Sequence, residues 1–440
     1  NTVDKFASTL ANVQATVDLN PHQIDAALFA FRSPLSKGAI LADEVGLGKT
    51  IEAGILISQK WAERKRKILI IAPATLRKQW SQELADKFFI HSMILEKKSF
   101  DQQIKNKNLN PFEQKDNVVI CSYQFVRSKD AYVSQVPWDL VIIDEAHRLR
   151  NVYKPNNKVA NAIKGAIAHA PKILLTATPL QNTLLELYGL VSIVDEHTFG
   201  DLQSFKDQFI NLSEVEEYQA LKNRLKTVCQ RTLRRQVLEY IKYTNRIALT
   251  QEFFPTDDEQ KLYDLVSDYL QKDNLYALPK SQRKLMTLIL RKLLASSTFA
   301  ISGTLDALSK RLQDLIDLQK QITEPLDIEA TTPDLETSNE LEDEWEDEEA
   351  EEAPTVLTGE QIDEVKHEKA LVDEFRKLAA SIHKNSKGEV LLQALKKGFE
   401  KLKELGALEK AVIFTESTRT QKYLLGILEE SEYTGKVILF

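Results

Sequence analysis

Short apolar runs alternate with helical stretches between residues 38 and 194, and this alternation is the strongest constraint on the fold. The runs read AILA, ILIIA, VVIC, LVIID and ILLT, and the stretches between or after them include TLRKQWSQELADKF and NTLLELYGLVSIV. Continuous β-branched strands separated by helices are typical of a parallel sheet that is covered on both faces. The pattern predicts an α/β lobe of the kind that binds nucleotides.

The sequence becomes helical beyond Phe199. Thr256 and Glu259 form a capping box, and the apolar residues after it lie on one helical face: Leu262, Leu265, Val266, Tyr269 and Leu270. The same spacing recurs at Leu285, Met286, Ile289, Leu290, Leu293 and Leu294, and again at Leu371, Phe375, Leu378 and Ile382. At KAVIFTESTRTQKYLLGILEE a strand, a loop and a helix begin again, and the strand KVILF follows, which predicts the start of a second α/β lobe.

These changes divide the chain into five segments. We expect an N-terminal α/β lobe at 1–198, a helical region at 199–320, an acidic linker at 321–365, a helical segment at 366–407 and the start of a second lobe at 408–440. The chain begins without methionine and ends in the apolar run GKVILF, so we expect a fragment whose second lobe is cut short.

The net charge of −7 is unevenly distributed. Residues 321–365 contain 18 Asp or Glu and no Lys or Arg, and removing these 18 charges leaves +11 for the other 395 residues. A basic remainder is compatible with a nucleic acid as partner. The acidic segment has few apolar residues and repels itself, so it is expected to be disordered. Its alternative interpretation, as a mimic of DNA that occupies a basic cleft, stays open.

The two cysteines, Cys121 and Cys229, are too few and too far apart for a disulfide framework or a zinc site. No apolar run approaches the roughly 20 residues of a membrane span, and the N-terminus lacks the basic-then-apolar pattern of a secretion signal. We therefore expect a cytoplasmic protein without a membrane partner.

The segment LADEVGLGKT ends like a phosphate-binding loop, although Asp43 stands where the general pattern G-x-x-x-x-G-K-[ST] has its first glycine. The glycines of residues 46–48 let backbone N–H groups turn toward phosphate oxygens, Lys49 supplies a positive charge, and Thr50 offers a hydroxyl to Mg²⁺. The helix that follows starts with the positive end of its dipole at the anion. A match this short also arises by chance.

About a hundred residues later, the run LVIIDEAH ends a buried strand in two adjacent carboxylates. Asp144 would hold Mg²⁺, and Glu145 would orient or deprotonate the attacking water. Two carboxylates at a strand end also occur as a simple helix cap. The loop with Lys49 and Thr50 favours the hydrolytic interpretation, which predicts a site for ATP and Mg²⁺.

The motifs LADEVGLGKT, DEAH and LLTATPLQN together resemble those of the Swi/Snf-type ATPases of helicase superfamily two. The form DEVGLGKT is especially similar to the bacterial RapA/HepA-like branch, and the resemblance extends through LNPHQ, IIAPATLRKQW, VVICSYQFV, DEAHRLRN and AVIFTES. It covers nearly the whole chain and specifies the helical region weakly. It implies an α/β fold with RecA-like lobes, and an Asp-Glu pair at the start of the phosphate loop.

The resemblance also implies residue roles. It makes Lys49, Asp144 and Glu145 catalytic, and it makes Thr50 and Asp144 the magnesium ligands. The residues that it assigns to nucleotide binding are Gln23 at the adenine, Gly46, Leu47, Gly48, Lys49 and Thr50. The residues that it expects to couple the nucleotide state to lobe movement are His147, Thr176, Thr178 and Gln181. An ordinary polar turn would also explain these last four.

Two further segments, APATLRKQW and CSYQFVR, start at strand ends, where hydroxyls and cations can contact a nucleic-acid backbone without reading its sequence. The candidate contacts are Thr75, Arg77, Lys78, Ser122 and Tyr123. A basic stretch carries Arg224, Lys226, Arg231, Arg234, Arg235 and Lys242. It is either an ordinary charged helix face or, as the resemblance favours, a duplex contact or a brace between lobes.

The function implied by the resemblance is that of an ATP-dependent translocase on double-stranded DNA, which remodels or displaces bound proteins as its lobes close on ATP. RapA-like relatives act on RNA polymerase or in antiphage defence, so both are candidate settings. A strand-separating DEAH-type helicase and a nucleotide-dependent scaffold are the alternatives. The family takes arginines for phosphoryl transfer from the second lobe, beyond Phe440, so this chain is expected to bind ATP but turn it over poorly.

Overall fold

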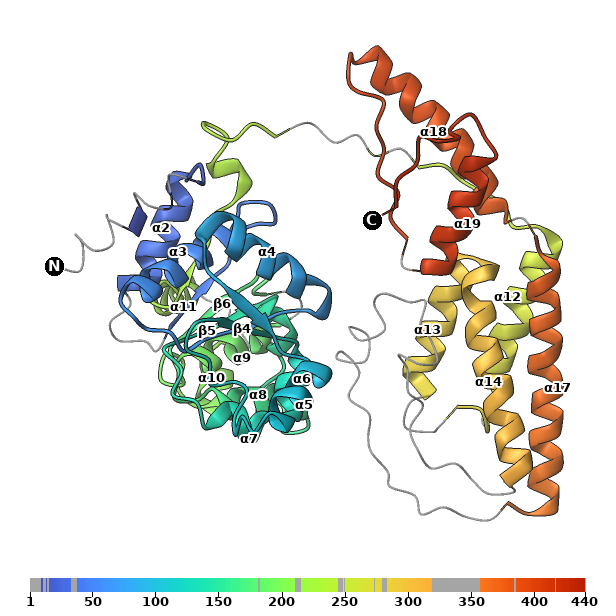
Figure 1. Ribbon diagram of the computed structural model, residues 1–440, viewed down its shortest axis with the longest axis horizontal. Coiled ribbons are helices and arrows are strands. Elements are labelled where there is room, and N and C mark those ends of the chain that lie inside the picture. Colours follow the sequence, from blue (N-terminus) through green and yellow to red (C-terminus); the bar gives the residue numbers. More distant parts are fainter. Residues whose placement is uncertain are drawn as a thin grey trace. The chain divides into compact units, whose positions relative to one another are not determined.

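The structure is a computed structural model, and the chain divides into two compact units, Asn1–Asn245 and Arg246–Phe440 (Figure 1). The described residues are 9–10, 13, 16–32, 38–180, 183–209, 215–243, 248, 250–272, 274–278, 283–318, 357–383, 385–415 and 417–439. Most of the predicted acidic linker, and Gln181 among the predicted coupling residues, lie outside them.

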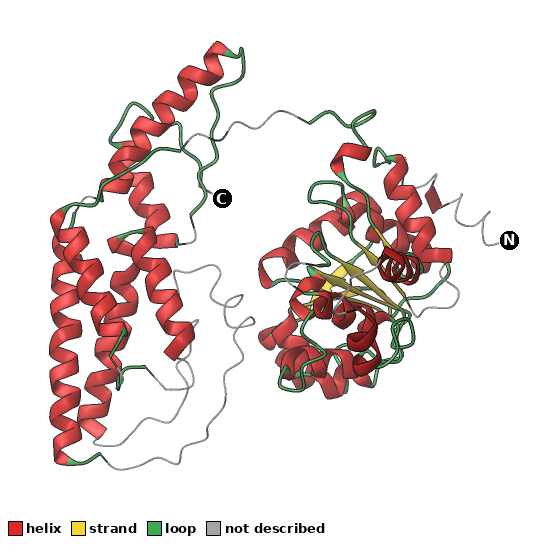
Figure 2. Cartoon of the chain, turned by 180° about the vertical axis from the view of Figure 1, so that it is seen from behind, coloured by secondary structure: helices red, strands yellow, loops and turns green. Residues whose placement is uncertain are grey.

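A seven-stranded sheet forms the centre of the first unit (Figure 2). Its order is β3-β4-β2-β5-β6-β1-β7, and every pairing is parallel. The strands are β1 Gly38–Leu41, β2 Ile68–Ile71, β3 Ser92–Ile94, β4 Val118–Cys121, β5 Leu140–Asp144, β6 Lys172–Leu175 and β7 Cys229–Gln230. The five predicted apolar runs are β1, β2, β4, β5 and β6, so the predicted α/β fold with a parallel sheet is confirmed.

Helices cover both faces of this sheet, because alternate residues of each strand point to opposite sides. Leu69 and Ile71 pack in one apolar cluster, whereas Ile68 and Ile70 pack in another. The helices of the unit are α2 Pro21–Arg32, α3 Lys49–Ala62, α4 Arg77–Phe88, α5 Lys97–Lys105, α6 Tyr123–Ser128, α7 Asp130–Ser134, α8 Lys158–Ala166, α9 Leu184–Val194, α10 Leu202–Phe209 and α11 Val215–Leu225. Three 3-10 turns add η1 Ala74–Leu76, η2 Ala146–Leu149 and η3 Arg234–Gln236.

The described part of the second unit is helical. Its helices are α12 Asp257–Leu270, α13 Arg283–Ser296, α14 Thr298–Leu318, α17 Gly359–Ser381, α18 Ser386–Glu404 and α19 Thr418–Glu429. The predicted capping box starts α12, where the Glu259 N–H donates to Thr256 Oγ1 at 3.3 Å and the Thr256 N–H donates to Glu259 Oε2 at 2.7 Å. Apolar faces of α12, α13, α14 and α17 form one buried cluster. None of the described helices combines the length and apolarity that a bilayer crossing requires.

The structure departs from the predicted segments in the region expected to be helical after residue 198. Residues 199–245 belong to the first unit and supply β7. This strand has only two residues. The N–H groups of Ile40 in β1 and of Ala42 just after β1 donate to Val228 O and Gln230 O, both at 2.7 Å. So short a strand leaves no periodicity to recognise.

Two other departures concern the predicted linker and the predicted second lobe. Residues 359–365 lie in α17 instead of a disordered linker, because Thr358 and Gln361 form a capping box and Val365 is buried. The runs AVIF at 411–414 and KVIL at 436–439 form no strand in the part of the chain that the structure describes. A strand needs a paired neighbour, and Phe414 and Ile438 are 91% and 80% exposed instead.

Candidate nucleotide-binding site

Three adjacent strands bring the predicted motifs to one edge of the sheet. Strand β6 lies between β1 and β5, so the phosphate loop after β1 and Asp144 at the end of β5 flank Thr176, which follows β6. The Thr176 N–H donates to Leu41 O at 3.1 Å. The carboxyl ends of parallel strands are the usual place for ligands in such sheets. The order of the strands therefore assembles the site.

The phosphate loop depends on two glycines in the left-handed region of the backbone. Gly46 has φ 83° and Gly48 has φ 91°, a conformation that other L-residues adopt only with strain. Gln23 packs directly against Gly48, and a Cβ atom there would lie 2.3 Å from Gln23 Nε2. Leu47 between them is buried. Gly48 also caps α3, which begins at Lys49 and continues through Thr50.

Lys49 interacts electrostatically with Asp144 and Glu145. Its Nζ donates to the backbone carbonyl of Asp43 at 3.0 Å. Its positive charge also lowers the pKa of Asp144 and of Glu145, although other contacts affect both pKa values more. The ammonium and the two carboxylates thus share one site, and the bond that holds Lys49 is to a neutral carbonyl that a phosphate oxygen could replace.

Asp144 is 8% exposed and is held at both carboxylate oxygens. Trp80 Nε1 donates to Oδ2 at 2.8 Å, and the Glu145 N–H donates to Oδ1 at 3.0 Å. Burial raises the pKa of Asp144, and the hydrogen bond from Trp80 opposes that rise. The Tyr123 hydroxyl donates to the backbone carbonyl of Asp144 at 2.5 Å. Trp80 and Tyr123 therefore fix the strand end that carries the carboxylate.

Glu145 has φ 52°, which is unusual for a residue with a side chain and is typical of functional positions. His147 Nδ1 lies 3.2 Å from Glu145 Oε2, and this contact is the main cause of a lowered pKa at Glu145. The carboxylate is therefore ionised at neutral pH. An ionised carboxylate can accept a hydrogen bond from a water molecule and orient it.

The Asp-Glu pair that replaces the usual first glycine binds the segment after β7. The Thr232 N–H donates to Asp43 Oδ1 at 2.6 Å, and the Arg234 N–H donates to Glu44 Oε2 at 2.5 Å. The Arg234 guanidinium donates to Val45 O from both Nε and Nη2. The two carboxylates thus act as acceptors that attach a distant segment to the phosphate loop.

Behind the loop, Asp43 shares a buried cluster with His22 and Glu52, whose ligand-capable atoms all lie within 4.8 Å of one another. His22 Nε2 lies 2.8 Å from Leu47 O and its Nδ1 lies 3.2 Å from the Tyr240 hydroxyl. Both imidazole nitrogens therefore have polar neighbours. Burial and the charge of Asp43 raise the pKa of Glu52 to about 9, so a proton on Glu52 can bind Asp43 Oδ2, which accepts from no other group of the described residues.

The predicted coupling residues lie partly at the site. Thr176 is fully buried and its Oγ1 accepts from the Thr178 N–H at 3.2 Å, while Thr178 is exposed. His147 contacts Glu145, as described above. The structure therefore places Thr176 and His147 beside the hydrolytic residues.

The predicted polymer contacts follow two neighbouring strands, β2 and β4. Thr75 and Lys78 are exposed, while Arg77 is half-buried and donates from Nε to Ala74 O at 3.1 Å. Ser122 caps α6 by accepting from the Phe125 N–H. Tyr123 differs from the expectation because its side chain is 2% exposed and its hydroxyl is bound below the hydrolytic site, so it offers no surface to a polymer.

Sequence reasoning missed three residues of the site. One is His22, which contacts the Leu47 carbonyl. Another is Trp80, which donates to Asp144. The third is Arg234, which donates to the Val45 carbonyl. The only signals were the position of His22 next to Gln23 and of Trp80 in the run TLRKQW after a strand. Arg234 was expected within a general basic stretch.

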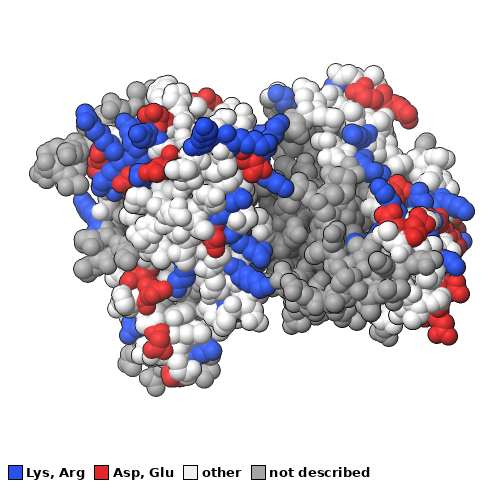
Figure 3. All heavy atoms as spheres, turned by 60° about the horizontal axis from the view of Figure 1, so that its bottom comes forward, with Lys and Arg blue, Asp and Glu red and all other residues white. Residues whose placement is uncertain are grey.

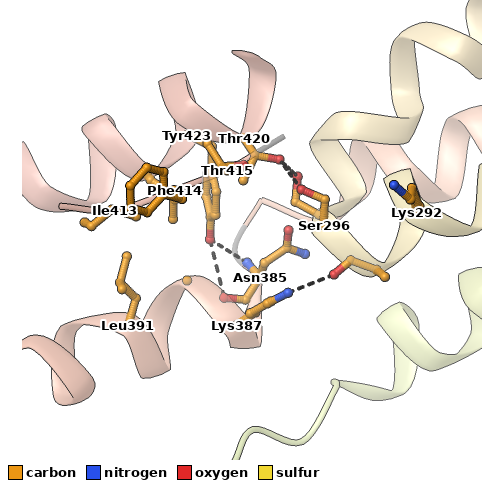
Figure 4. A pocket seen from close by; sticks show the side chains of 14 residues that line it. Lys292, Ser296, Asn385, Lys387, Leu391, Ile413, Phe414, Thr415, Thr420 and Tyr423 are labelled. Carbon is orange, nitrogen blue, oxygen red and sulfur yellow. Dashed lines mark hydrogen bonds between the residues drawn. The ribbon is translucent and has the colours of Figure 1, made fainter. Parts of the chain in front are cut away.

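A cavity of about 660 Å³ lies in the second unit between α13, α18, α19 and residues 413–415 (Figure 4). The Asn385 N–H donates to the Tyr423 hydroxyl at 2.6 Å, and Lys387 Nζ donates to Ala295 O at 3.0 Å. Its described lining residues include no carboxylate. The cavity therefore lacks the carboxylates that the first unit provides.

Comparison with known proteins gives the family. The sequence model of the SNF2-related domain matches residues 22–301. The protein named "Uncharacterized ATP-dependent helicase YqhH" of Bacillus subtilis is 36% identical over 272 residues, which are 61% of this chain and 45% of that protein. The RNA polymerase-associated protein RapA of Sodalis glossinidius is 33% identical over 195 residues, which are 43% of this chain and 20% of that protein. The matches thus span less than half of each relative.

A solved SWI2/SNF2 ATPase core of Sulfolobus solfataricus, in complex with double-stranded DNA, aligns with a TM-score of 0.43 at 18% identity and covers 69% of this chain and 66% of that one. A likeness at this level adds nothing to the sequence match. The domain match covers most of the chain, and both relatives are more than 30% identical over the stretches that they match. The chain belongs to the SNF2-related domain family.

Proposed function

We propose that this chain binds ATP with Mg²⁺ at the edge formed by β1, β6 and β5, and that it hydrolyses the γ-phosphate bond. The observation that carries the proposal is the convergence of Lys49, Asp144 and Glu145 from two strand ends onto one glycine-rich loop. Family membership supports the same reaction.

The residues fit this ligand. Gly46 and Gly48 adopt the left-handed backbone that such a loop requires, Lys49 is bonded to a neutral carbonyl, and Thr50 lies in the first turn of α3. Thr50 and Asp144 would hold Mg²⁺, which neutralises phosphate charge as the bond breaks. Lys49 would bind the β- and γ-phosphates. Glu145, kept ionised by His147, would orient the attacking water.

We further propose that the polymer is double-stranded DNA and that ATP turnover drives movement along it. Exposed Thr75 and Lys78 and the hydroxyl of Ser122 follow strands of the same edge. Outside residues 321–365 the chain carries a net charge of +11, and Lys and Arg side chains are interspersed with acidic ones on the surface in Figure 3. Two relatives of RapA type are named for their association with RNA polymerase. RNA polymerase is therefore a protein partner to test with this chain.

Residues 408–440 are proposed to begin the second RecA-like lobe. Val412, Phe414 and Ile438 expose apolar side chains that neighbouring strands would cover.

The test is ATP turnover without polymer and with duplex DNA, single-stranded DNA or RNA, with Lys49→Ala as background. Stimulation by duplex DNA alone supports the translocase. Stimulation by RNA or single strands favours an unwinding helicase instead. A partner that binds equally well to wild type and Lys49→Ala under all nucleotide conditions would favour a scaffold.

A further inference from the structure

The segment after β7 closes over one side of the phosphate loop. The Thr232 N–H binds the Asp43 carboxylate at 2.6 Å, and the Glu44 N–H returns a bond to Thr232 O at 3.1 Å. Two positions later, Arg234 donates its backbone N–H to the Glu44 carboxylate and its guanidinium to Val45 O, at 3.1 Å from Nε and 2.6 Å from Nη2. A planar fork on one carbonyl oxygen holds that peptide in a defined orientation.

A second loop carbonyl is held by a different element. Leu47 O lies 2.8 Å from His22 Nε2 and accepts from Gln23 Nε2 at 3.0 Å, and both donors belong to α2. The carbonyls on both sides of Gly46 are thus bound by side chains from outside the loop. These bonds leave the loop little freedom to rotate its peptides.

The direction of a peptide carbonyl also fixes the direction of the N–H group of the same peptide. The described chain has no cis peptide, and in a trans peptide the C=O and the following N–H point in opposite directions. The Asp43–Glu44 peptide shows this, since its N–H donates to Thr232 and its carbonyl accepts from Lys49 on the other side. By the same rule, Arg234 on the Val45 carbonyl directs the Gly46 N–H away from the arginine.

We propose that Arg234 is a positioning residue of the nucleotide site. It holds the Val45 carbonyl outward so that the Gly46 N–H faces the β-phosphate, in the manner of the backbone nests that bind anions. This rests on the proposed function, in which the loop binds ATP. Arg234 acts through the backbone and touches neither phosphate nor polymer. The neighbouring Arg235 is exposed and serves as a matched control.

The experiment measures the dissociation constant of Mg-ADP for wild type, Arg234→Ala, Arg234→Lys and Arg235→Ala, together with the thermal midpoint without nucleotide. Arg234→Ala should weaken ADP binding by about tenfold, which is about 1.4 kcal/mol and within the range of a charge-assisted hydrogen bond. The ADP affinity of Arg234→Lys should lie between those of wild type and Arg234→Ala, because an ammonium lacks the planar fork of donors of a guanidinium. Arg235→Ala should bind within about twofold of wild type. Inorganic pyrophosphate, which has no base, should lose affinity by the same factor as ADP.

Each result decides the matter. A loss of affinity in Arg234→Ala at an unchanged thermal midpoint supports the proposal, since a merely structural role would shift the midpoint instead. Unchanged ADP affinity, or equal losses in both alanine variants, overturns it. If Arg234→Ala does not fold, Arg234→Lys gives the same decision. Wild type that binds no ADP defeats the proposed function as well, whereas binding that Lys49→Ala abolishes and Arg234→Ala leaves intact defeats only the role of Arg234.

Discussion

Replacing Glu52 by glutamine should stabilise the first unit at neutral and alkaline pH. Glu52 has no exposed surface, neither of its carboxyl oxygens has a donor, and Asp43 lies beside it. Burial, followed by the charge of Asp43, raises the pKa of Glu52 from 4.5 to about 9. The side chain is therefore protonated in the folded chain at neutral pH and ionised in the unfolded chain.

The sign and size of the effect follow from proton linkage. Between pH 4.5 and 9 the folded state holds one more proton than the unfolded state, so the free energy of unfolding falls as pH rises. The contribution of Glu52 is fully present below pH 4.5 and is lost as pH rises through 9. At about 1.4 kcal/mol per pKa unit, the loss is about 3 kcal/mol by pH 7. In Glu52→Gln the amide would exchange no proton, and its N–H groups can donate to Asp43.

Urea unfolding followed by tryptophan fluorescence measures this, because Trp61, Trp80 and Trp138 lie in the first unit and only Trp345 lies outside it. The stability advantage of Glu52→Gln over wild type should grow by about 3 kcal/mol from pH 6 to pH 8. His22 and Asp43 are present in both proteins, so their own titration largely cancels in the comparison.

The control is Glu239→Gln, at an exposed position of the same unit. Its stability relative to wild type should not change with pH by more than a few tenths of a kcal/mol. If the advantage of Glu52→Gln is the same at pH 6 and pH 8, Glu52 is ionised in the folded chain and the reasoning is refuted.

Three further substitutions test packing and hydrogen bonding near the site. Trp80→Phe should lower the free energy of unfolding by about 1.5–3 kcal/mol, because the buried Asp144 carboxylate loses a donor; a loss below about 0.5 kcal/mol in urea unfolding would contradict this. Gly189→Ala should cost about 1–3 kcal/mol in the same assay, because its Cβ atom would lie 2.0 Å from Arg150 O. Gly165→Ala, with nothing within 4 Å of the added atom, should raise stability by about 0.4–1 kcal/mol and is the matched comparison. If Gly189→Ala and Gly165→Ala change the free energy of unfolding equally, helix propensity alone determines the effect and the clash at Arg150 O contributes nothing.

The pattern of the sequence was informative where the physics is local. Buried parallel strands are continuous apolar runs, so β1, β2, β4, β5 and β6 could be predicted. The capping box at Thr256 was equally readable, because its two partners are three residues apart. The runs at 411–414 and 436–439 have strand composition but no neighbour to pair with among the described residues, so the start of a second lobe there stays a prediction.

The sequence by itself determined which residues carry the proposed chemistry, since the glycine loop, Lys49, Asp144 and Glu145 are each recognised from residue type and spacing. Only the tertiary structure decided what Asp43 and Glu44 do. The Asp43 carboxylate accepts from the Thr232 N–H, 189 residues along the chain. The Glu44 carboxylate accepts from the Arg234 N–H, 190 residues along the chain. Such contacts depend on β7 pairing beside β1. No local periodicity encodes them, because the order of strands in a sheet is set by how all of its helices pack at once.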